Sequence, residues 1–139
     1  MKIMVVDDEE DVQLLFKQQF RKEIKSGTVE FQFALSAESA LDLLEKEDSL
    51  NISQILSDIN MPGMTGIDLL KKIKEQYQQL KVSMITAYAD GENLQEARKH
   101  GCDDYFTKPI DIDAFVEFMK PHLQSKNVET PKNETTSGE

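Results

Sequence analysis

Five polar side chains follow four short apolar segments of the chain. Asp7 and Asp8 follow the first segment, and Asp58, Thr86 and Lys108 follow three later ones. If these segments are parallel strands of one sheet, their carboxyl ends share the edge at which open α/β folds place their sites. Two carboxylates at contact distance repel each other by about 4 kcal/mol at a surface-like dielectric constant, so three of them call for a cation. Mg²⁺, a hard cation that prefers oxygen ligands, meets this need and would bring phosphoryl chemistry with it.

The composition limits both the size and the partners of the protein. The 139 residues fit one domain, and a hydrophobic fraction of 39% is enough for one buried core. A net charge of -10 argues against direct binding of nucleic acid, which depends on clusters of lysine and arginine. Cys102 is the only cysteine, so neither an internal disulfide nor a zinc site with paired thiols can form, and we expect it to be a small buried hydrophobe.

The start of the chain bears on its location. The apolar run at residues 3–6 is followed at once by acids, so we expect neither a signal peptide nor a membrane span. Together with the single cysteine, this favours a protein of the cytoplasm.

Apolar residues recur at the spacing of strands and helices in alternation. The predicted strands cover residues 2–6, 29–35, 55–58, 82–85 and 105–106, and the predicted helices cover 12–24, 40–44, 67–77, 92–100 and 113–119. Parallel neighbours need crossover connections, so this order predicts an α/β fold with a parallel sheet and helices on both of its faces. We expect one domain at residues 1–124. Residues 125–139 are almost free of apolar side chains and are expected to form a flexible polar tail or the start of a linker.

Four segments of the chain carry a resemblance to a known family. They read VVDDEED at 5–11, LSDINMPGMTG at 56–66, MITAYAD at 84–90 and GCDDYFTKPI at 101–110. In order and spacing they resemble the receiver domain of bacterial response regulators, the CheY-like family of two-component signalling, over residues 2–123. The resemblance implies the flavodoxin-like (βα)5 fold, a doubly wound sandwich whose five-stranded parallel sheet has the strand order 2-1-3-4-5.

The resemblance also implies roles for single residues. Asp58 would accept a phosphoryl group from a phosphohistidine, and Lys108 would pair with the phosphoryl oxygens. Mg²⁺ would be bound by the carboxylates of Asp8 and Asp58 and by the backbone carbonyl of Asn60, with Asp7 acting mainly through water. The residue types suit this chemistry, because an ionised carboxylate needs no general base to act as a nucleophile. It needs its charge neutralised, which a metal ion and a lysine can do.

A second pair of residues would pass the signal on. The resemblance implies that Thr86 would hydrogen-bond to the phosphoryl group and that Tyr105 would rotate inward when Thr86 moves. This rotation would reshape the face made by the fourth helix, fifth strand and fifth helix. The implied partners are a sensor histidine kinase or phosphotransfer protein, and either an unknown downstream protein or a C-terminal effector domain beyond this chain. A phosphorylation-dependent homodimer is a further form of output. We expect no nucleic acid or membrane partner.

Two other functions stay open at this point. A Mg²⁺-dependent phosphohydrolase with an aspartyl nucleophile would use Asp7 and Glu9, which have the required spacing, but it would leave Asp58 unexplained. An interaction module without phosphorylation would usually have lost residues of the pocket, and here none is missing. A flavin carrier of the same fold is disfavoured because residues 7–10 are all acidic and would repel a phosphate. We therefore expect a signalling domain that catalyses only its own phosphorylation and dephosphorylation, and not an enzyme.

Overall fold

The computed structural model describes residues 1–46, 51–87, 91–107, 114–115 and 117–118. In this part of the chain, one five-stranded parallel sheet has the order β2-β1-β3-β4-β5. The strands are β1 (Lys2–Val6), β2 (Glu30–Ala34), β3 (Ile52–Asp58), β4 (Lys81–Thr86) and β5 (Asp104–Thr107). The predicted fold class and strand order are confirmed. The expected tail at 125–139 lies outside the described residues.

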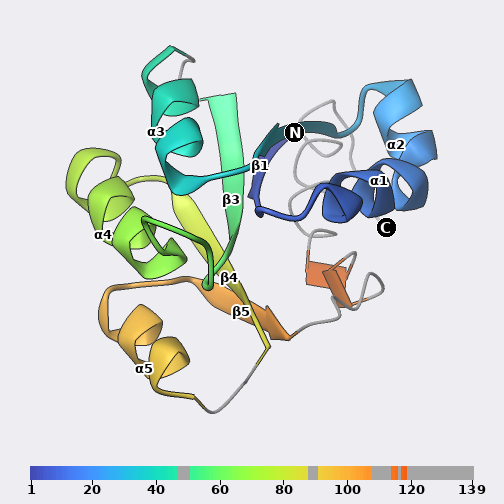
Figure 1. The fold of residues 1–139 in the computed structure, drawn as a ribbon. Helices are drawn as coiled ribbons and strands as arrows, with labels where there is room; N and C mark the ends of the chain where they lie inside the picture. The colour runs from blue at the N-terminus through green and yellow to red at the C-terminus, as the bar shows by residue number, and fades with distance from the viewer. Residues whose placement is uncertain (47–50, 88–90, 108–113, 116, 119–139) are drawn as a thin grey trace, which may run out of the picture.

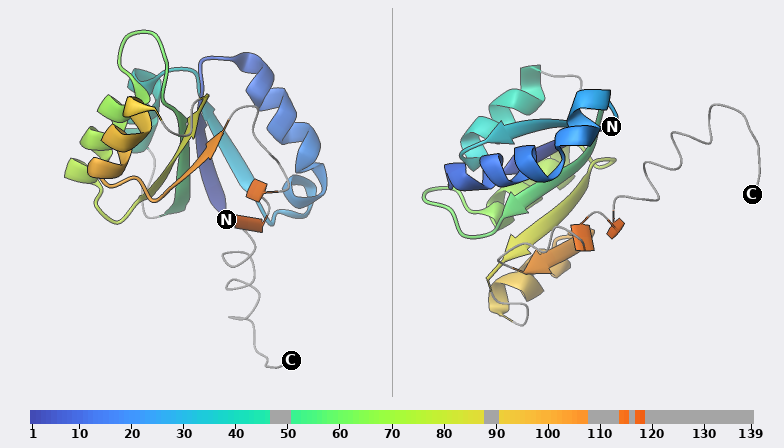
Figure 2. Two further views of the ribbon diagram at one scale, coloured as in Figure 1. Left: turned by 90° about the horizontal axis from the view of Figure 1, so that it is seen from below. Right: turned by 90° about the vertical axis from the view of Figure 1, so that its right-hand side faces the viewer.

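Helices cover both faces of this sheet. They are α1 (Glu10–Gln19), α2 (Arg21–Ser26), α3 (Ala37–Lys46), α4 (Gly66–Gln76) and α5 (Glu92–Lys99). Figure 1 shows α3, α4 and α5 on one side of the sheet and α1 with α2 on the other, and the view from below separates the two layers more clearly (Figure 2). Of the helix predicted at 113–119, the described residues 114–115 and 117–118 are helical. None of the described helices has the length and apolar composition needed to span a membrane.

Each face of the sheet has its own core. The face under α3, α4 and α5 is mainly aliphatic, with Met4, Val6 and Ile55 among its members. The other face is rich in phenylalanine, and Phe16 and Phe115 there are 0% and 1% exposed. Successive residues of β1 feed the two cores in turn. Residues 3–6 are therefore all buried, which is the pattern of a central strand in a sheet covered on both sides.

The helix predicted at 12–24 is broken into α1 and α2 at Phe20. Its backbone leaves the helical range at φ -110° and ψ 25°, while its ring packs on Phe16 and Phe31 in the aromatic core. The hydrogen bonds from Phe20 N to Phe16 O and from Ile24 N to Phe20 O are kept, at 3.0 and 2.8 Å. Because the apolar spacing of four residues continues through the break, a pattern of hydrophobic residues cannot reveal it.

Asp103, the residue before β5, ties α4 to the amino end of β4. Its Oδ2 accepts the backbone N–H of Val82 at 2.8 Å and the ammonium of Lys74 on α4 at 3.1 Å. Lys74 also donates to the carbonyl of Leu80 at 2.9 Å. Cys102 beside it is half-buried and packs against the aliphatic core, so the expected burial is only partial. Burial, and to a lesser degree the charge of Asp103, raise the pKa of the Cys102 thiol.

Removing the Asp103 carboxylate should cost measurable stability. We expect Asp103→Ala to lower the free energy of unfolding by about 1–2 kcal/mol, because the Val82 amide loses its acceptor and Lys74 loses its counter-ion. Urea denaturation followed by circular dichroism measures the loss. Glu75→Ala, which removes an exposed acid from α4, is the matched control and should change stability by less than about 0.5 kcal/mol. Equal losses in the two variants would contradict this role of Asp103.

Candidate functional site

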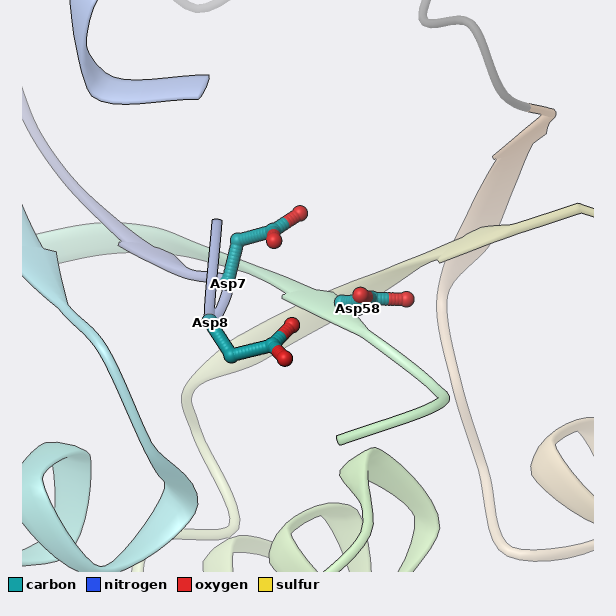
Figure 3. A group of neighbouring side chains, drawn as sticks. All are labelled: Asp7, Asp8 and Asp58. Atoms are coloured by element: carbon teal, nitrogen blue, oxygen red, sulfur yellow. The ribbon is translucent and has the colours of Figure 1, made fainter. Parts of the chain in front are cut away.

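Three carboxylates meet at the carboxyl edge of the sheet. In the parallel pairing of β1 with β3, Val6 lies beside Ser57, so Asp7, just after β1, and Asp58, the last residue of β3, lie side by side. One carboxylate oxygen from each of Asp7, Asp8 and Asp58 lies within 4.8 Å of the other two. Figure 3 shows the three side chains projecting to the same side of this edge. Asp7 and Asp58 are each 3% exposed, whereas Asp8 is open to solvent.

Backbone amides fix the two buried carboxylates. Oδ1 of Asp7 accepts the N–H of Glu9 at 2.9 Å, and Oδ1 of Asp58 accepts the N–H of Asn60 at 3.2 Å. Both bonds reach two residues ahead, which is the geometry of an Asx turn. Each amide stabilises the ionised form of its carboxylate. The turns therefore orient both groups at the edge of the sheet.

The segment after Asp58 is packed closely against α4. Ile59 donates its N–H to the carbonyl of Ile85 on β4 at 3.0 Å, and Gly66 at the start of α4 donates to the carbonyl of Ile59 at 2.9 Å. Thr65 caps the helix, accepting the N–H of Asp68 while Asp68 accepts the N–H of Thr65. The backbone that carries Asp58 is thus held both by the neighbouring strand and by the first turn of α4.

The other predicted residues of the site have different outcomes. Thr86 ends β4, is 2% exposed and is one position beyond Ile85, the strand partner of Asp58. It is therefore close to the acidic edge. Tyr105 is half-buried on β5, and the guanidinium carbon of Arg98 lies 5.0 Å from the centre of its ring. Lys108 lies outside the described residues, so its predicted place in the pocket stays a prediction.

One contact at this edge was not predicted. Asn93, in the first turn of α5, donates from its side-chain amide to the side-chain oxygen of Asn60 at 3.5 Å. The contact joins the loop after Asp58 to α5. Asn93 belongs to no motif in the sequence, and only the pairing of the strands brings its helix to Asn60. No local signal could have found it.

The donors at the acidic edge suit a hard divalent cation. Asp7, Asp8 and Asp58 offer oxygen atoms only, which favours Mg²⁺ or Ca²⁺ over metals that prefer nitrogen or sulfur. One carboxylate oxygen from each residue lies within 4.8 Å of the other two, so the three groups face a common space. The residues present therefore fit the metal.

Comparisons with known proteins agree on one family. The family model described as the response regulator receiver domain matches residues 3–120. Sporulation initiation phosphotransferase F of Bacillus subtilis (strain 168) is 35% identical over 126 residues, which are 91% of this chain and 96% of that protein. The DNA-binding transcriptional regulator NtrC of Proteus hauseri is 37% identical over 127 residues, but this chain spans only 25% of its length.

Solved structures support the same assignment. A CheY-like response regulator receiver domain protein from Methanospirillum hungatei JF-1 superposes with a TM-score of 0.76 at 30% identity, covering 92% of this chain and 97% of that one. The receiver domain of NtrX from Brucella abortus superposes with a TM-score of 0.72 at 28% identity, covering 88% and 98%. The strand order, the acidic edge and these likenesses lead to one conclusion: the chain belongs to the response regulator receiver domain family.

Proposed function

We propose that Asp58 is the phosphoacceptor of this receiver domain and that the reaction depends on Mg²⁺. The donor is a sensor histidine kinase or a phosphotransfer protein in the cytoplasm. The observation that carries the proposal is the meeting of three carboxylates within 4.8 Å, with Asp58 buried at the end of a central strand. Glu9, which a phosphohydrolase would need beside Asp7, is exposed and is not part of this group, so the geometry favours the receiver function.

The chain supplies position and charge for the transfer. An oxygen of Asp58 attacks the phosphorus of the donor phosphohistidine, a P–O bond forms, the P–N bond breaks, and the electron pair returns to the imidazole. The Asn60 amide holds the other side of the carboxylate in place. Mg²⁺, bound by Asp8, Asp58 and the carbonyl of Asn60, with Asp7 acting through water, would neutralise the charge that the acids and the phosphoryl group bring together. Lys108 completes the predicted pocket.

The response to phosphorylation belongs to the same proposal. Three new acceptor oxygens at Asp58 attract the hydroxyl of Thr86 by a charge-assisted hydrogen bond. Its movement gives Tyr105 space to turn inward, away from Arg98. The face formed by α5, β5 and the helix predicted at 113–119 then takes a second arrangement, whose population rises with phosphorylation. The reader of this face is a downstream protein, an effector domain or a second copy of the chain.

Phosphorylation can be tested on the intact protein. With acetyl phosphate and Mg²⁺, we expect mass spectrometry to show the addition of one phosphoryl group, which Asp58→Ala and an excess of EDTA each abolish. Asp42→Ala, which removes an exposed acid from α3, is the control and should be phosphorylated like the parent. An unmodified parent protein would favour the interaction module instead. Catalytic turnover of p-nitrophenyl phosphate would favour the phosphohydrolase.

A further inference from the structure

A groove lies between the end of α1, α2 and the edge strand β2, on the aromatic side of the sheet. Its volume is about 570 Å³, and its apolar lining includes Ile24, Phe31 and Phe33. Ile24 is 36% exposed, and both phenylalanines are only half-buried. Figure 2 shows α1 and α2 together over this side of the sheet. The groove therefore leaves a strip of aromatic and aliphatic surface open to solvent.

The rim of the groove is basic, although the protein as a whole is strongly acidic. Lys17, Arg21 and Lys25 are exposed and line the groove. Residues 17–25 contain four basic residues and one acid, a net charge of +3 in a chain of net charge -10. The ammonium of Lys17 lies 5.6 Å from the centre of the Phe33 ring, so the charge is held over the apolar floor. At physiological salt, interactions between exposed charges are screened beyond about 8 Å. A segment bound in the groove therefore interacts mainly with this local positive charge and little with the negative charge elsewhere on the protein.

The third feature is the backbone of β2. In the described part of the chain, β2 is the last strand of the sheet and pairs with β1 alone. Glu30 donates its N–H to Met1 O at 2.8 Å, and the carbonyl of Ala34 accepts from Asp7 N at 3.0 Å. Alternate residues of a parallel strand face the same neighbour, so the N–H and C=O groups of Phe31 and Phe33 point away from β1. They form an edge to which another strand can bond.

We propose that this groove is a docking site for an extended acidic segment of a partner protein, added as a strand beside β2. Such a segment would bond to the backbone of Phe31 and Phe33, insert alternate apolar side chains over their rings, and place its carboxylates near Lys17, Arg21 and Lys25. The one acid of the lining, Glu30, has its own cation, with Lys2 Nζ 3.9 Å from its Oε2.

The shape and charge of the surface favour this occupant over two others. A membrane surface would not fit this site, because the apolar side chains line a concave groove and do not project from the protein. The negative charge of the whole protein would also be repelled by anionic lipids. A second copy of the chain would be repelled, because each of the two chains has a net charge of -10. The groove also begins where α1 ends, whereas the acidic edge lies before α1 begins, and the ten-residue helix spans about 15 Å. Docking therefore leaves the phosphorylation site accessible.

The binding test uses the full chain and a labelled peptide. The probe is a fluorescein-labelled twelve-residue peptide of alternating valine and glutamate, and fluorescence anisotropy at physiological salt should give a Kd on the order of 10⁻⁵ M. Arg21→Glu combined with Lys25→Glu should weaken binding by about tenfold. Lys71→Glu combined with Lys72→Glu makes the same change of charge on α4, beside a different groove, and should change binding by less than about twofold. Circular dichroism checks that both variants are folded.

A second measurement tests the strand geometry. Hydrogen exchange should show that the peptide protects the amides of Phe31 and Phe33, and a peptide with proline at its two central positions should neither protect them nor bind. Equal weakening by the two double variants, or binding of the proline peptide, would overturn the proposal. Failure of the peptide to bind would also overturn the proposal if the groove proved to have another occupant. That occupant would be a membrane if the protein bound phosphatidylglycerol vesicles, or a second copy if it formed a dimer on a sizing column, provided that Arg21→Glu with Lys25→Glu abolished the effect. Asp58→Ala should bind the peptide normally, which separates this test from that of phosphorylation.

Discussion

Alanine in place of Gly66 is expected to lower the free energy of unfolding by about 3 kcal/mol. A Cβ atom at this position would overlap the carbonyl oxygen of Asp58, and it would lie 2.9 Å from the carbonyl carbon of Asp58 and from Cα of Ile59. All of these are backbone atoms, which cannot rotate aside as a side chain does. The start of α4 or the end of β3 must therefore move. The cost arises from this overlap, and it falls on the residue that we propose as phosphoacceptor.

The cause of the loss can be isolated by a second glycine. Gly27 has a φ of +82° but no atom within 4 Å of an added Cβ. Gly27→Ala should therefore lower the free energy of unfolding only by the cost of a left-handed backbone conformation, about 1 kcal/mol. Urea denaturation of both variants gives the two values. Gly66→Ala should also slow phosphorylation by acetyl phosphate, whereas Gly27→Ala should leave that rate unchanged. If the two variants lose the same stability and react at the same rate, the close approach of α4 to Asp58 has no importance.

The parallel register explains why much of the site could be predicted from the sequence. Once the apolar segments are taken as neighbouring parallel strands, the residues that follow them must share an edge, and the strand pairing brings Asp7 beside Asp58 as this requires. The strand order itself came from the resemblance to receiver domains, because a hydrophobic pattern does not contain it. Thr86 follows by the same reasoning, one residue beyond the strand partner of Asp58.

The features that were missed depend on packing between distant segments. β3 begins at Ile52, earlier than predicted. The prediction missed its first residues because the polar Gln54, which is buried in the sheet at 2% exposure, interrupts the apolar run. The need for Gly66 comes from the approach of α4 to the backbone of Asp58, and the contact of Asn93 with Asn60 comes from the position of α5. Each of these requires coordinates, since no local spacing of residues encodes it.

Removing Asp8 should separate metal binding from folding. Asp8 is the exposed member of the acidic group, and no described hydrogen bond or ion pair holds its side chain, so the fold does not depend on it. If the parent protein is held at a Mg²⁺ concentration 100 times its Kd, binding should stabilise it by about 2.7 kcal/mol. We expect Asp8→Ala to weaken the affinity about 100-fold, because a direct ligand is worth at least as much as an outer-shell partner. The same concentration then equals the Kd, and the stabilisation falls to about 0.4 kcal/mol.

The stability without metal should change in the opposite direction. Relief of repulsion from Asp7 and Asp58 is expected to raise the free energy of unfolding of Asp8→Ala by about 1 kcal/mol, the value for two charges 4 Å apart in water. Denaturation with and without Mg²⁺ measures both effects on the same samples. Asp11→Ala removes an exposed acid three residues further on and should keep the full response to Mg²⁺. A variant at Asp8 that responds to Mg²⁺ like the parent would show that the ion, if bound, is held without this carboxylate. The charge balance proposed for the transfer to Asp58 would then fail, because Asp8 would remain an uncompensated anion beside the incoming phosphoryl group.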